Sequence, residues 1–302
     1  MRFDAVLIAG PTASGKSAAA LALAEAFGGV VINADSMQVY RELRVLSARP
    51  SDDDMARAPH LLYGHVGANE AYSVGRYQSD AAQAFGEARG RLPIFVGGTG
   101  LYFAALTEGL ANIPPVPAAI RTAAREKLAA VGVKRLHEEL AARDPQTAAR
   151  LRDSDPQRVL RAYEVFEATG RPLSRWQREA GTPVLAGLRL AKFVLEVPRA
   201  ELRERIARRF DAMLASGARA EAAALQGLDP SLPAAKILGL RELWAAASGA
   251  LSESEAIRLA VTATSQYAKR QTTWFRHRMH NWKWVNAGNK SNYIAELRHY
   301  LS

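Results

Sequence analysis

The chain has 302 residues, with 40 Lys and Arg against 30 Asp and Glu, a formal net charge of +10, and no cysteine. Apolar residues make up 48%, enough for a packed core, which excludes a disordered chain. Zero cysteine excludes disulfides, Cys-ligated zinc, iron–sulfur clusters and a Cys nucleophile. Neither a cleavable leader pattern nor a run of about 20 apolar residues is present, so we expect a cytoplasmic protein without a membrane segment.

The positive charge is concentrated in the second part of the chain. Residues 1–116 carry 9 basic and 11 acidic side chains, whereas residues 117–302 carry 31 basic and 19 acidic ones. Between 256 and 295 there are seven Lys and Arg and no acidic residue. Such a one-sided balance predicts a polyanionic partner; the alternative is charge that serves solubility alone.

Strands and helices alternate over the first hundred residues. Short apolar runs at 4–9, 30–34 and 93–96 predict buried parallel strands. The segments 14–27 and 72–92 predict helices between them. This alternation is typical of a parallel sheet with helices on its faces.

The middle of the chain is predicted to be mostly helical. From 118 to about 178 the pattern is helical, and a fourth strand is predicted at 188–197. Gly and Pro interrupt the helical block at Gly132, Pro145, Pro156 and 170–172. Further helices are predicted at 199–216, 219–226, 239–247 and 253–278.

These patterns together predict an α/β fold. We expect a P-loop NTPase-like parallel sheet flanked by helices, formed by residues 1–116 and 186–302. Residues 117–185 are expected to form an inserted all-helical domain.

A phosphate-binding motif follows the first predicted strand. The residues Gly10-Pro11-Thr12-Ala13-Ser14-Gly15-Lys16-Ser17 fit the pattern G-x-x-x-x-G-K-[ST]. Glycines let backbone N–H groups turn inward around phosphate oxygens, and the next helix adds its positive end. Lys16 can bridge phosphate oxygens and the Ser17 hydroxyl can bind Mg²⁺. The alternative is a merely structural glycine turn, and the motif does not specify which phosphate compound is bound.

Two polar loops follow the next strands at the same expected sheet edge. Asp35 comes just after the second strand and can accept a proton or hold Mg²⁺ through water, unless it only caps a helix. The run Gly97-Gly98-Thr99-Gly100 follows the third strand and lets backbone approach a ligand, unless it only serves strand–helix packing. We expect these loops to face one ligand crevice.

Two predicted helices combine cations with aromatic or apolar residues. Arg158 and Arg161 lie three positions apart, on one helical face. The run 269–276 mixes Lys and Arg with Trp274 and Phe275. Cations neutralise phosphates and aromatic rings stack on unpaired bases, so these helices are candidates for RNA binding. The alternatives are core packing for the aromatic residues and surface ion pairs for the arginines.

Five motifs, in order, resemble the tRNA dimethylallyltransferase family, also called tRNA isopentenyltransferases. The motifs are residues 10–17, Asp35-Ser36-Met37-Gln38-Val39-Tyr40, residues 96–102, residues 155–162 with 169–172, and residues 268–276. The resemblance spans nearly the whole chain. The chain departs from the usual family pattern at 46–50 and at 59–64, and its Gly239-Leu240-Arg241 stands where the family usually has Gly-Tyr-Arg.

The resemblance implies transfer of a dimethylallyl group from dimethylallyl diphosphate, with Mg²⁺, to the exocyclic amine of the adenosine 3′ of the tRNA anticodon. Asp35 is then the general base, Thr99 lies beside the reacting centre, and Lys16 acts on the leaving diphosphate that residues 10–17 hold. Implied tRNA-binding residues are Asp35, Ser36, Met37, Gln38, Thr99, Arg121, Gln157, Arg158, Val159, Leu160, Arg161, Lys236, Gly239, Arg241, Lys269, Arg270, Gln271, Thr272, Thr273, Trp274, Phe275 and Arg276.

Two other functions fit part of the sequence. A P-loop kinase of a nucleoside or small metabolite accounts for the phosphate motif and Asp35, but not for the basic second part. The second alternative is a non-catalytic RNA-binding or nucleotide-switch protein, in which Asp35 is only a helix cap. We expect a monomer whose partners are tRNA and dimethylallyl diphosphate.

Overall fold

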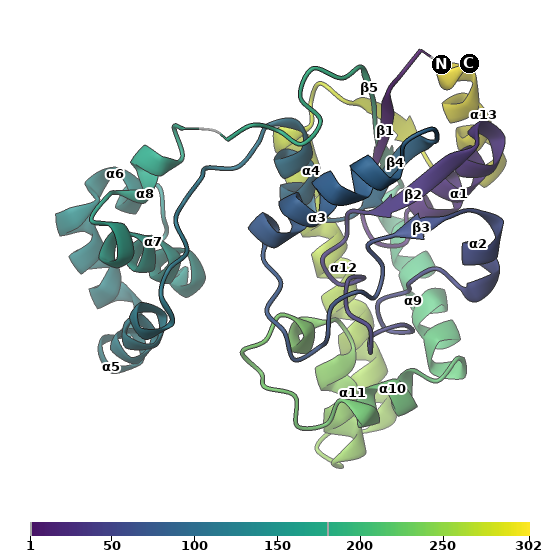
Figure 1. The fold of residues 1–302 in the computed structure, drawn as a ribbon. Coiled ribbons are helices and arrows are strands. Elements are labelled where there is room, and N and C mark those ends of the chain that lie inside the picture. Colours follow the sequence, from purple (N-terminus) through teal and green to yellow (C-terminus); the bar gives the residue numbers. More distant parts are fainter. Residues whose placement is uncertain (1, 180) are drawn as a thin grey trace. The chain divides into compact units, whose positions relative to one another are not determined.

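The computed structural model describes residues 2–179 and 181–302. The chain divides into two compact units, one formed by Met1–Leu106 with Val184–Ser302 and the other by Thr107–Pro183 (Figure 1). The second unit begins ten residues before the expected position 117. The reason is that Ile113 and Val116, which flank two consecutive prolines, pack on the core of the helical unit.

A six-stranded parallel sheet forms the centre of the first unit. Its order is β3 (His60–Leu61), β2 (Gly29–Asn33), β4 (Leu92–Gly97), β1 (Ala5–Ala9), β5 (Leu190–Glu196) and β6 (Lys283–Asn286). The four inner strands are those predicted from apolar runs. The two edge strands were not predicted, because β3 has two residues and β6 gains its partner only when distant segments meet.

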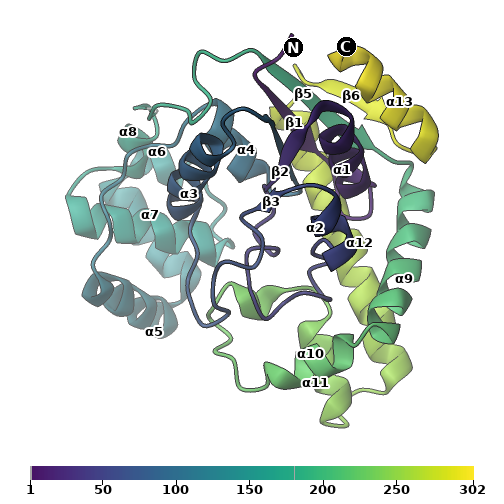
Figure 2. The same ribbon diagram turned by 45° about the vertical axis from the view of Figure 1, so that its right-hand side comes forward.

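Helices cover both faces of this sheet. The helices of the first unit are α1 (Lys16–Phe27), α2 (Asp52–Arg57), α3 (Val74–Glu87), α4 (Gly100–Thr107), α9 (Arg199–Ala215), α10 (Ala218–Ala224), α11 (Leu240–Ala247), α12 (Glu253–Arg278) and α13 (Lys290–Leu301), with a short 3₁₀ turn at Ala234–Lys236. Of these, α10 and α11 pack on α9 and α12, away from the strands. Alternate residues of β1 enter different cores: Leu7 faces the core with α3, α4 and α12, and Ile8 faces the core with α1 and α13. Figure 2 shows α1 and α13 side by side against the sheet.

The long helix α12 has the bounds predicted from sequence. Its buried residues recur every three or four positions, at Ala256, Ala260, Thr264, Ala268, Gln271 and Phe275, as one core-facing stripe requires. The predicted helix 72–92 is shorter than expected. Ser73 caps α3 by accepting the Arg76 N–H at 3.1 Å, and β4 already begins at Leu92.

The second unit contains α5 (Ala118–Arg143), α6 (Pro145–Ala148), α7 (Pro156–Thr169) and α8 (Leu173–Trp176). Each predicted break marks a helix start, a helix end or a kink; Gly132 kinks α5 at a φ of 77°. Leu136, Leu140, Val159 and Val165 pack together in its core. Among the described residues, no helix combines the length and apolar character needed to cross a membrane.

Candidate active site

The loop between β1 and α1 forms a cradle of backbone groups at the carboxyl edge of the sheet. Ala13 and Gly15 both have positive φ, 62° and 89°. A Cβ on Gly15 would lie 2.5 Å from the Tyr293 hydroxyl, so glycine is required there. Ser14 is fully buried, and its Oγ has no hydrogen-bond partner within the described residues. A strained loop with an unsatisfied buried hydroxyl is suited to an anionic ligand, which supplies the missing acceptor.

Two cations, the buried Lys16 and the half-buried Arg209, lie at this loop without a carboxylate partner. Lys16 is 7% exposed, and Arg209 on α9 donates a hydrogen bond to Thr12 Oγ1. No acidic side chain of the described residues lies within ion-pair distance of Lys16 or Arg209. Burial lowers the pKa of Lys16 to about 8; the Asp35 charge opposes this and the Arg209 charge adds to it. Burial likewise lowers the pKa of Arg209, against the effect of Asp35. The loop therefore carries excess positive charge in a desolvated place.

Asp35 lies between the β2 and β4 loops, as their positions predicted. Its Oδ1 accepts the Met37 N–H at 3.1 Å. Thr99 donates its backbone N–H to Ala34 O at 3.2 Å, and Thr99 Oγ1 accepts the Ser36 N–H at 2.9 Å. A Cβ on Gly98 would lie 3.1 Å from Asp35 Oδ2, and one on Gly97 would collide with the Ala34 carbonyl. The glycines of the second loop thus let it approach the carboxylate closely.

The charge of Asp35 acts on three tyrosines. Burial raises the pKa of Tyr63, Tyr102 and Tyr267, and in each case the negative charge of Asp35 raises it further. Tyr102 stacks on Tyr77 with ring centroids 3.7 Å apart, which fixes its ring. These phenols therefore stay neutral beside the negative charge of Asp35.

Gln271 on α12 joins the two glycine loops. Its Oε1 accepts the Thr12 N–H at 2.9 Å, and its Nε2 donates to Gly98 O at 2.9 Å. The side chain is 5% exposed, and a Cβ on Gly98 would collide with it. Gln271 therefore faces the protein interior.

The other expected tRNA-binding residues divide by exposure. Exposed side chains are those of Arg121, Gln157, Arg158, Arg161, Lys236, Arg241, Lys269, Arg270, Thr273 and Arg276. Ser36, Met37, Thr99, Leu160, Thr272 and Trp274 are half-buried. Gly239, with a φ of 92°, is packed against Phe210.

Besides Gly239, four expected tRNA-binding residues are buried. Val159 and Phe275 are 0% exposed in their cores, and Gln271 makes the internal bridge described above. Gln38 donates its amide to the carbonyls of Ser47 and Ala48 at 3.0 and 2.8 Å. We leave Val159, Gln271 and Phe275 out of the RNA-contacting set, because their side chains already pack inside the protein.

The donor set at the phosphate loop fits Mg²⁺ bound together with a diphosphate. Ser17 is exposed in the first turn of α1. The described residues contain no cluster of three or more His, Cys, Asp or Glu that could hold a metal. Mg²⁺ commonly uses one or two protein oxygens, phosphate oxygens and waters, so the Ser17 hydroxyl suffices as a protein ligand.

Sequence reasoning missed Arg209, Tyr63, Tyr267 and Asn33. For Arg209 a signal was present, since it lies three positions after buried Ile206 and four before buried Met213, on the core side of α9. Its neighbour Arg208 is exposed. The tyrosines carry no such signal, because only the fold brings them under the influence of Asp35. Asn33 is two positions from Asp35, but the sequence does not show that its side chain also reaches Leu62 O.

Comparisons with known proteins show the family to which this chain is related. The profile of the IPP transferase family matches residues 38–278, and that of isopentenyl transferases matches residues 3–62. The tRNA dimethylallyltransferase of Methylocella silvestris is 54% identical over 288 residues, 94% of this chain and 95% of that protein. The tRNA dimethylallyltransferase of Bradyrhizobium sp. is 53% identical over 298 residues, 97% of each chain.

Solved structures give the same result. The tRNA isopentenylpyrophosphate transferase of Bacillus halodurans superposes with a TM-score of 0.69 at 32% identity, covering 99% of this chain and 95% of that one. A eukaryotic dimethylallyltransferase acting on tRNA superposes with a TM-score of 0.81 at 26% identity, covering 98% and 77%. The chain therefore belongs to the IPP transferase family, among the bacterial tRNA dimethylallyltransferases.

Proposed function

We propose that this enzyme transfers a dimethylallyl group from dimethylallyl diphosphate to the exocyclic amine of the adenosine 3′ of the anticodon in tRNA. The observation that carries the proposal is the combination of two cations without a carboxylate partner, Lys16 and Arg209, with a carboxylate, Asp35, whose charge acts on both of them. The cations suit a diphosphate leaving group, and the carboxylate suits a base for the attacking amine.

The phosphate loop stabilises the charge that develops as the bond between the allylic carbon and the diphosphate oxygen breaks. Lys16 and Arg209 neutralise the departing diphosphate, and Ser14 Oγ is free to donate to one of its oxygens. These groups are already desolvated and fixed, so they need no reorganisation as the charge builds up. Mg²⁺ bound to the diphosphate and Ser17 would supply further positive charge.

Asp35 removes the proton from the amine. Its Oδ1 is held by the Met37 N–H, which leaves Oδ2, on the side of Gly98, to accept the proton as the new C–N bond forms. Tyr63, Tyr102 and Tyr267, whose buried phenols feel the Asp35 charge, stay neutral and do not compete with Asp35 for the proton.

Exposed cations bind the RNA. We assign this role to Arg158 and Arg161 on α7, Lys269, Arg270 and Arg276 on α12, Lys236, Arg241 and Arg121. Trp274 packs over Gly100 beside the second glycine loop, where its ring can contact a base. Every group of the site comes from one chain, so a monomer acting on tRNA in the cytoplasm suffices.

One assay tests the reaction. The protein is incubated with Mg²⁺, dimethylallyl diphosphate and an unmodified tRNA that has adenosine 3′ of its anticodon, and the RNA is digested to nucleosides for mass measurement. We expect a dimethylallyl-adenosine mass that appears only with the prenyl donor. A parallel reaction contains ATP instead; consumption of ATP without a change in nucleoside mass would favour a kinase and contradict the proposal.

A further inference from the structure

We infer that Asn33 is a positioning residue for the transfer reaction, one that fixes the direction of the Asp35 carboxylate. The inference rests on the proposed role of Asp35 as the base. Asn33 is the last residue of β2, and its side chain is 0% exposed. It contacts no expected substrate group, so its effect on the reaction is exerted through Asp35.

The Asn33 side chain makes three hydrogen bonds. Its Oδ1 accepts the Asp35 N–H at 2.9 Å, and its Nδ2 donates to Asp35 O at 2.9 Å. The second hydrogen of Nδ2 goes to Leu62 O at 3.0 Å. One amide group therefore satisfies both backbone polar groups of Asp35 and a carbonyl of another segment, so both of its N–H donors are used.

This arrangement determines which carboxylate oxygen is free. With the Asp35 backbone held at both ends, the carboxylate can turn only about its side-chain bonds, and the Met37 N–H binds Oδ1. Oδ2 is then the oxygen directed toward Gly98. A general base must hold its lone pair within hydrogen-bond reach of the proton it accepts, so loss of this restraint lowers the rate of proton transfer.

The third hydrogen bond anchors Asp35 to the segment after β3. Leu62 has a φ of 63°, a strained conformation for a branched side chain, and its carbonyl is held by Asn33. The next residue, Tyr63, is one of the tyrosines that feel the Asp35 charge. Asn33 thus fixes the base and the segment that leads into Tyr63 together.

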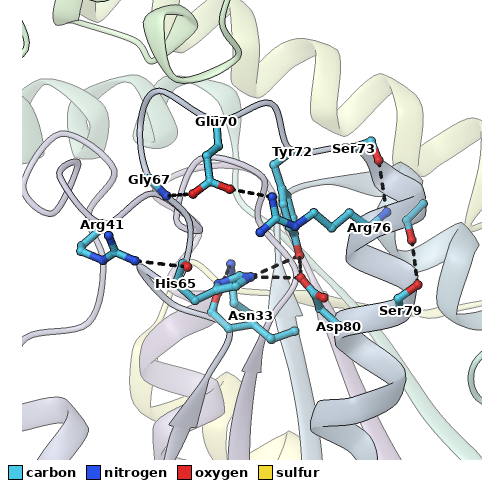
Figure 3. A network of polar contacts seen from close by, with 12 residues as sticks. Asn33, Arg41, His65, Gly67, Glu70, Tyr72, Ser73, Arg76, Ser79 and Asp80 are labelled. Atoms are coloured by element: carbon cyan, nitrogen blue, oxygen red, sulfur yellow. Dashed lines mark hydrogen bonds and ion pairs between the residues drawn. The ribbon is translucent and has the colours of Figure 1, made fainter. Parts of the chain in front are cut away.

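The segment after Leu62 is also held at His65, so the Leu62 carbonyl has a fixed position. Figure 3 shows the side chains of His65, Tyr72 and Asp80 directed toward one another. Tyr72 donates its hydroxyl to Asp80 Oδ2 at 2.7 Å, and His65 Nε2 lies 3.3 Å from the same oxygen. The Leu62 carbonyl is therefore held by Asn33 of β2, and the chain just after it is held at His65 by Asp80 of α3.

Three substitutions at Asn33 test the inference. Asn33→Asp keeps the shape but loses both N–H donors and adds a charge. Asn33→Ala removes every bond, whereas Asn33→Ser keeps a hydroxyl that can accept the Asp35 N–H. We expect the single-turnover rate of prenyl transfer to fall at least 30-fold in Asn33→Asp and Asn33→Ala, and less in Asn33→Ser. The KM for dimethylallyl diphosphate and for an anticodon stem–loop RNA should stay within about threefold.

The pH profile separates positioning from general stability. In Asn33→Asp the added carboxylate repels the negative charge of Asp35, so the acid limb of the rate should move to higher pH, whereas Asn33→Ala adds no charge and its acid limb should not move. The matched control is Asn286→Ala. Asn286 ends β6 and its Oδ1 accepts the Gly288 N–H at 2.9 Å, a similar turn away from Asp35. We expect its rate to equal that of the unmodified enzyme.

Each other outcome overturns the inference. Asn33 variants with the unmodified rate, or with a loss that matches only their unfolded fraction by circular dichroism, would make Asn33 merely structural. A loss confined to either KM would place Asn33 in binding. Failure of the unmodified enzyme to form product from dimethylallyl diphosphate would instead refute the proposed function, and it would do so before any variant is compared.

Discussion

The two compact units hold their cations in opposite ways. In the α/β unit, Lys16 is 7% exposed and has no carboxylate within ion-pair distance among the described residues. In the helical unit, the side chain of Arg158 is 75% exposed and lies 3.4 Å from Asp155, and that of Arg161 is 46% exposed and lies 3.9 Å from Glu164. Charges in a desolvated site act strongly, whereas exposed charges are screened by water and salt and act weakly and in a salt-dependent way.

Under the proposed function, this difference separates the residues that take part in the reaction from the residues that bind the RNA. A diphosphate of fixed size needs charges that are placed and desolvated in advance, and the phosphate loop supplies them. An RNA surface needs many exchangeable contacts, and exposed arginines supply those at little structural cost. Substitutions in the α/β site should therefore change the rate or donor binding, and substitutions of the exposed cations should change RNA affinity alone.

The largest effect is expected for Asp35→Asn. The amide keeps the side-chain shape but cannot accept the proton, so turnover should fall about 10³-fold while RNA binding stays within twofold. Product formation by nucleoside mass and RNA binding by filter retention measure the two quantities. Asp53→Asn, at an exposed acid on α2, is the matched control. Equal loss of turnover and RNA binding would make Asp35 a structural residue and remove the contrast.

A second prediction compares two adjacent arginines on α9. Arg209→Ala removes a charged donor from the phosphate loop, so binding of dimethylallyl diphosphate should weaken about 30- to 100-fold. Arg208→Ala, at an exposed position, should change it less than twofold. Calorimetric titration with the donor measures both. Similar effects of the two substitutions would show that net charge, and not placement, governs donor binding.

Local sequence patterns were sufficient for the parts of the site that each lie within one segment. The motif at 10–17 specifies its own loop, and the position of Asp35 after β2 predicts its sheet edge. The 3.6-residue periodicity of α12 gave both of its ends. These features depend on neighbouring residues, which a sequence displays directly.

The remaining features depend on contacts between distant segments. Asn33 reads as an ordinary polar residue at a strand end, and nothing local shows that its amide reaches Leu62. Gln271 lies among basic residues, and only its 259-position separation from Thr12, closed by the fold, shows that it faces inward. Pairing of β6 with β5 likewise joins segments about 90 residues apart. Sequence patterns alone do not encode such closures.

A third prediction tests the exposed side of the comparison. Arg158→Ala should weaken binding of an anticodon stem–loop about three- to tenfold and make the dependence of log affinity on log salt shallower by about one. Donor binding should not change. Arg135→Ala, in the same unit with a side chain 63% exposed, is the control for loss of a surface charge. An unchanged salt dependence for Arg158→Ala would mean that this arginine contacts no phosphate.

The smallest expected effect is the uptake of a fraction of a proton by Lys16 when the donor binds. The pKa of Lys16 is lowered from 10.5 to about 8, so in the free enzyme above pH 8 much of this lysine is neutral. A bound diphosphate favours the charged form, so binding should take up about three quarters of a proton at pH 8.5. The donor contributes little, because a terminal phosphate with a pKa near 6 is already ionised. Calorimetry in two buffers of different ionisation enthalpy measures this uptake.

The lowered pKa of Lys16 also affects the free energy of unfolding. Its pH dependence has the opposite sign to that of a lysine whose pKa is raised by an acidic partner. Between pH 8 and 10.5 the unfolded state binds more protons at Lys16 than the folded state does, so the contribution of Lys16 to the free energy of unfolding rises with pH across this window. Lys16→Met should abolish both the proton uptake and this rise, whereas Lys269→Met, at an exposed position, should leave them unchanged. Donor binding without proton uptake at pH 8.5 would show that Lys16 is fully charged in the free enzyme, and that the phosphate loop is less desolvated than its buried side chains indicate.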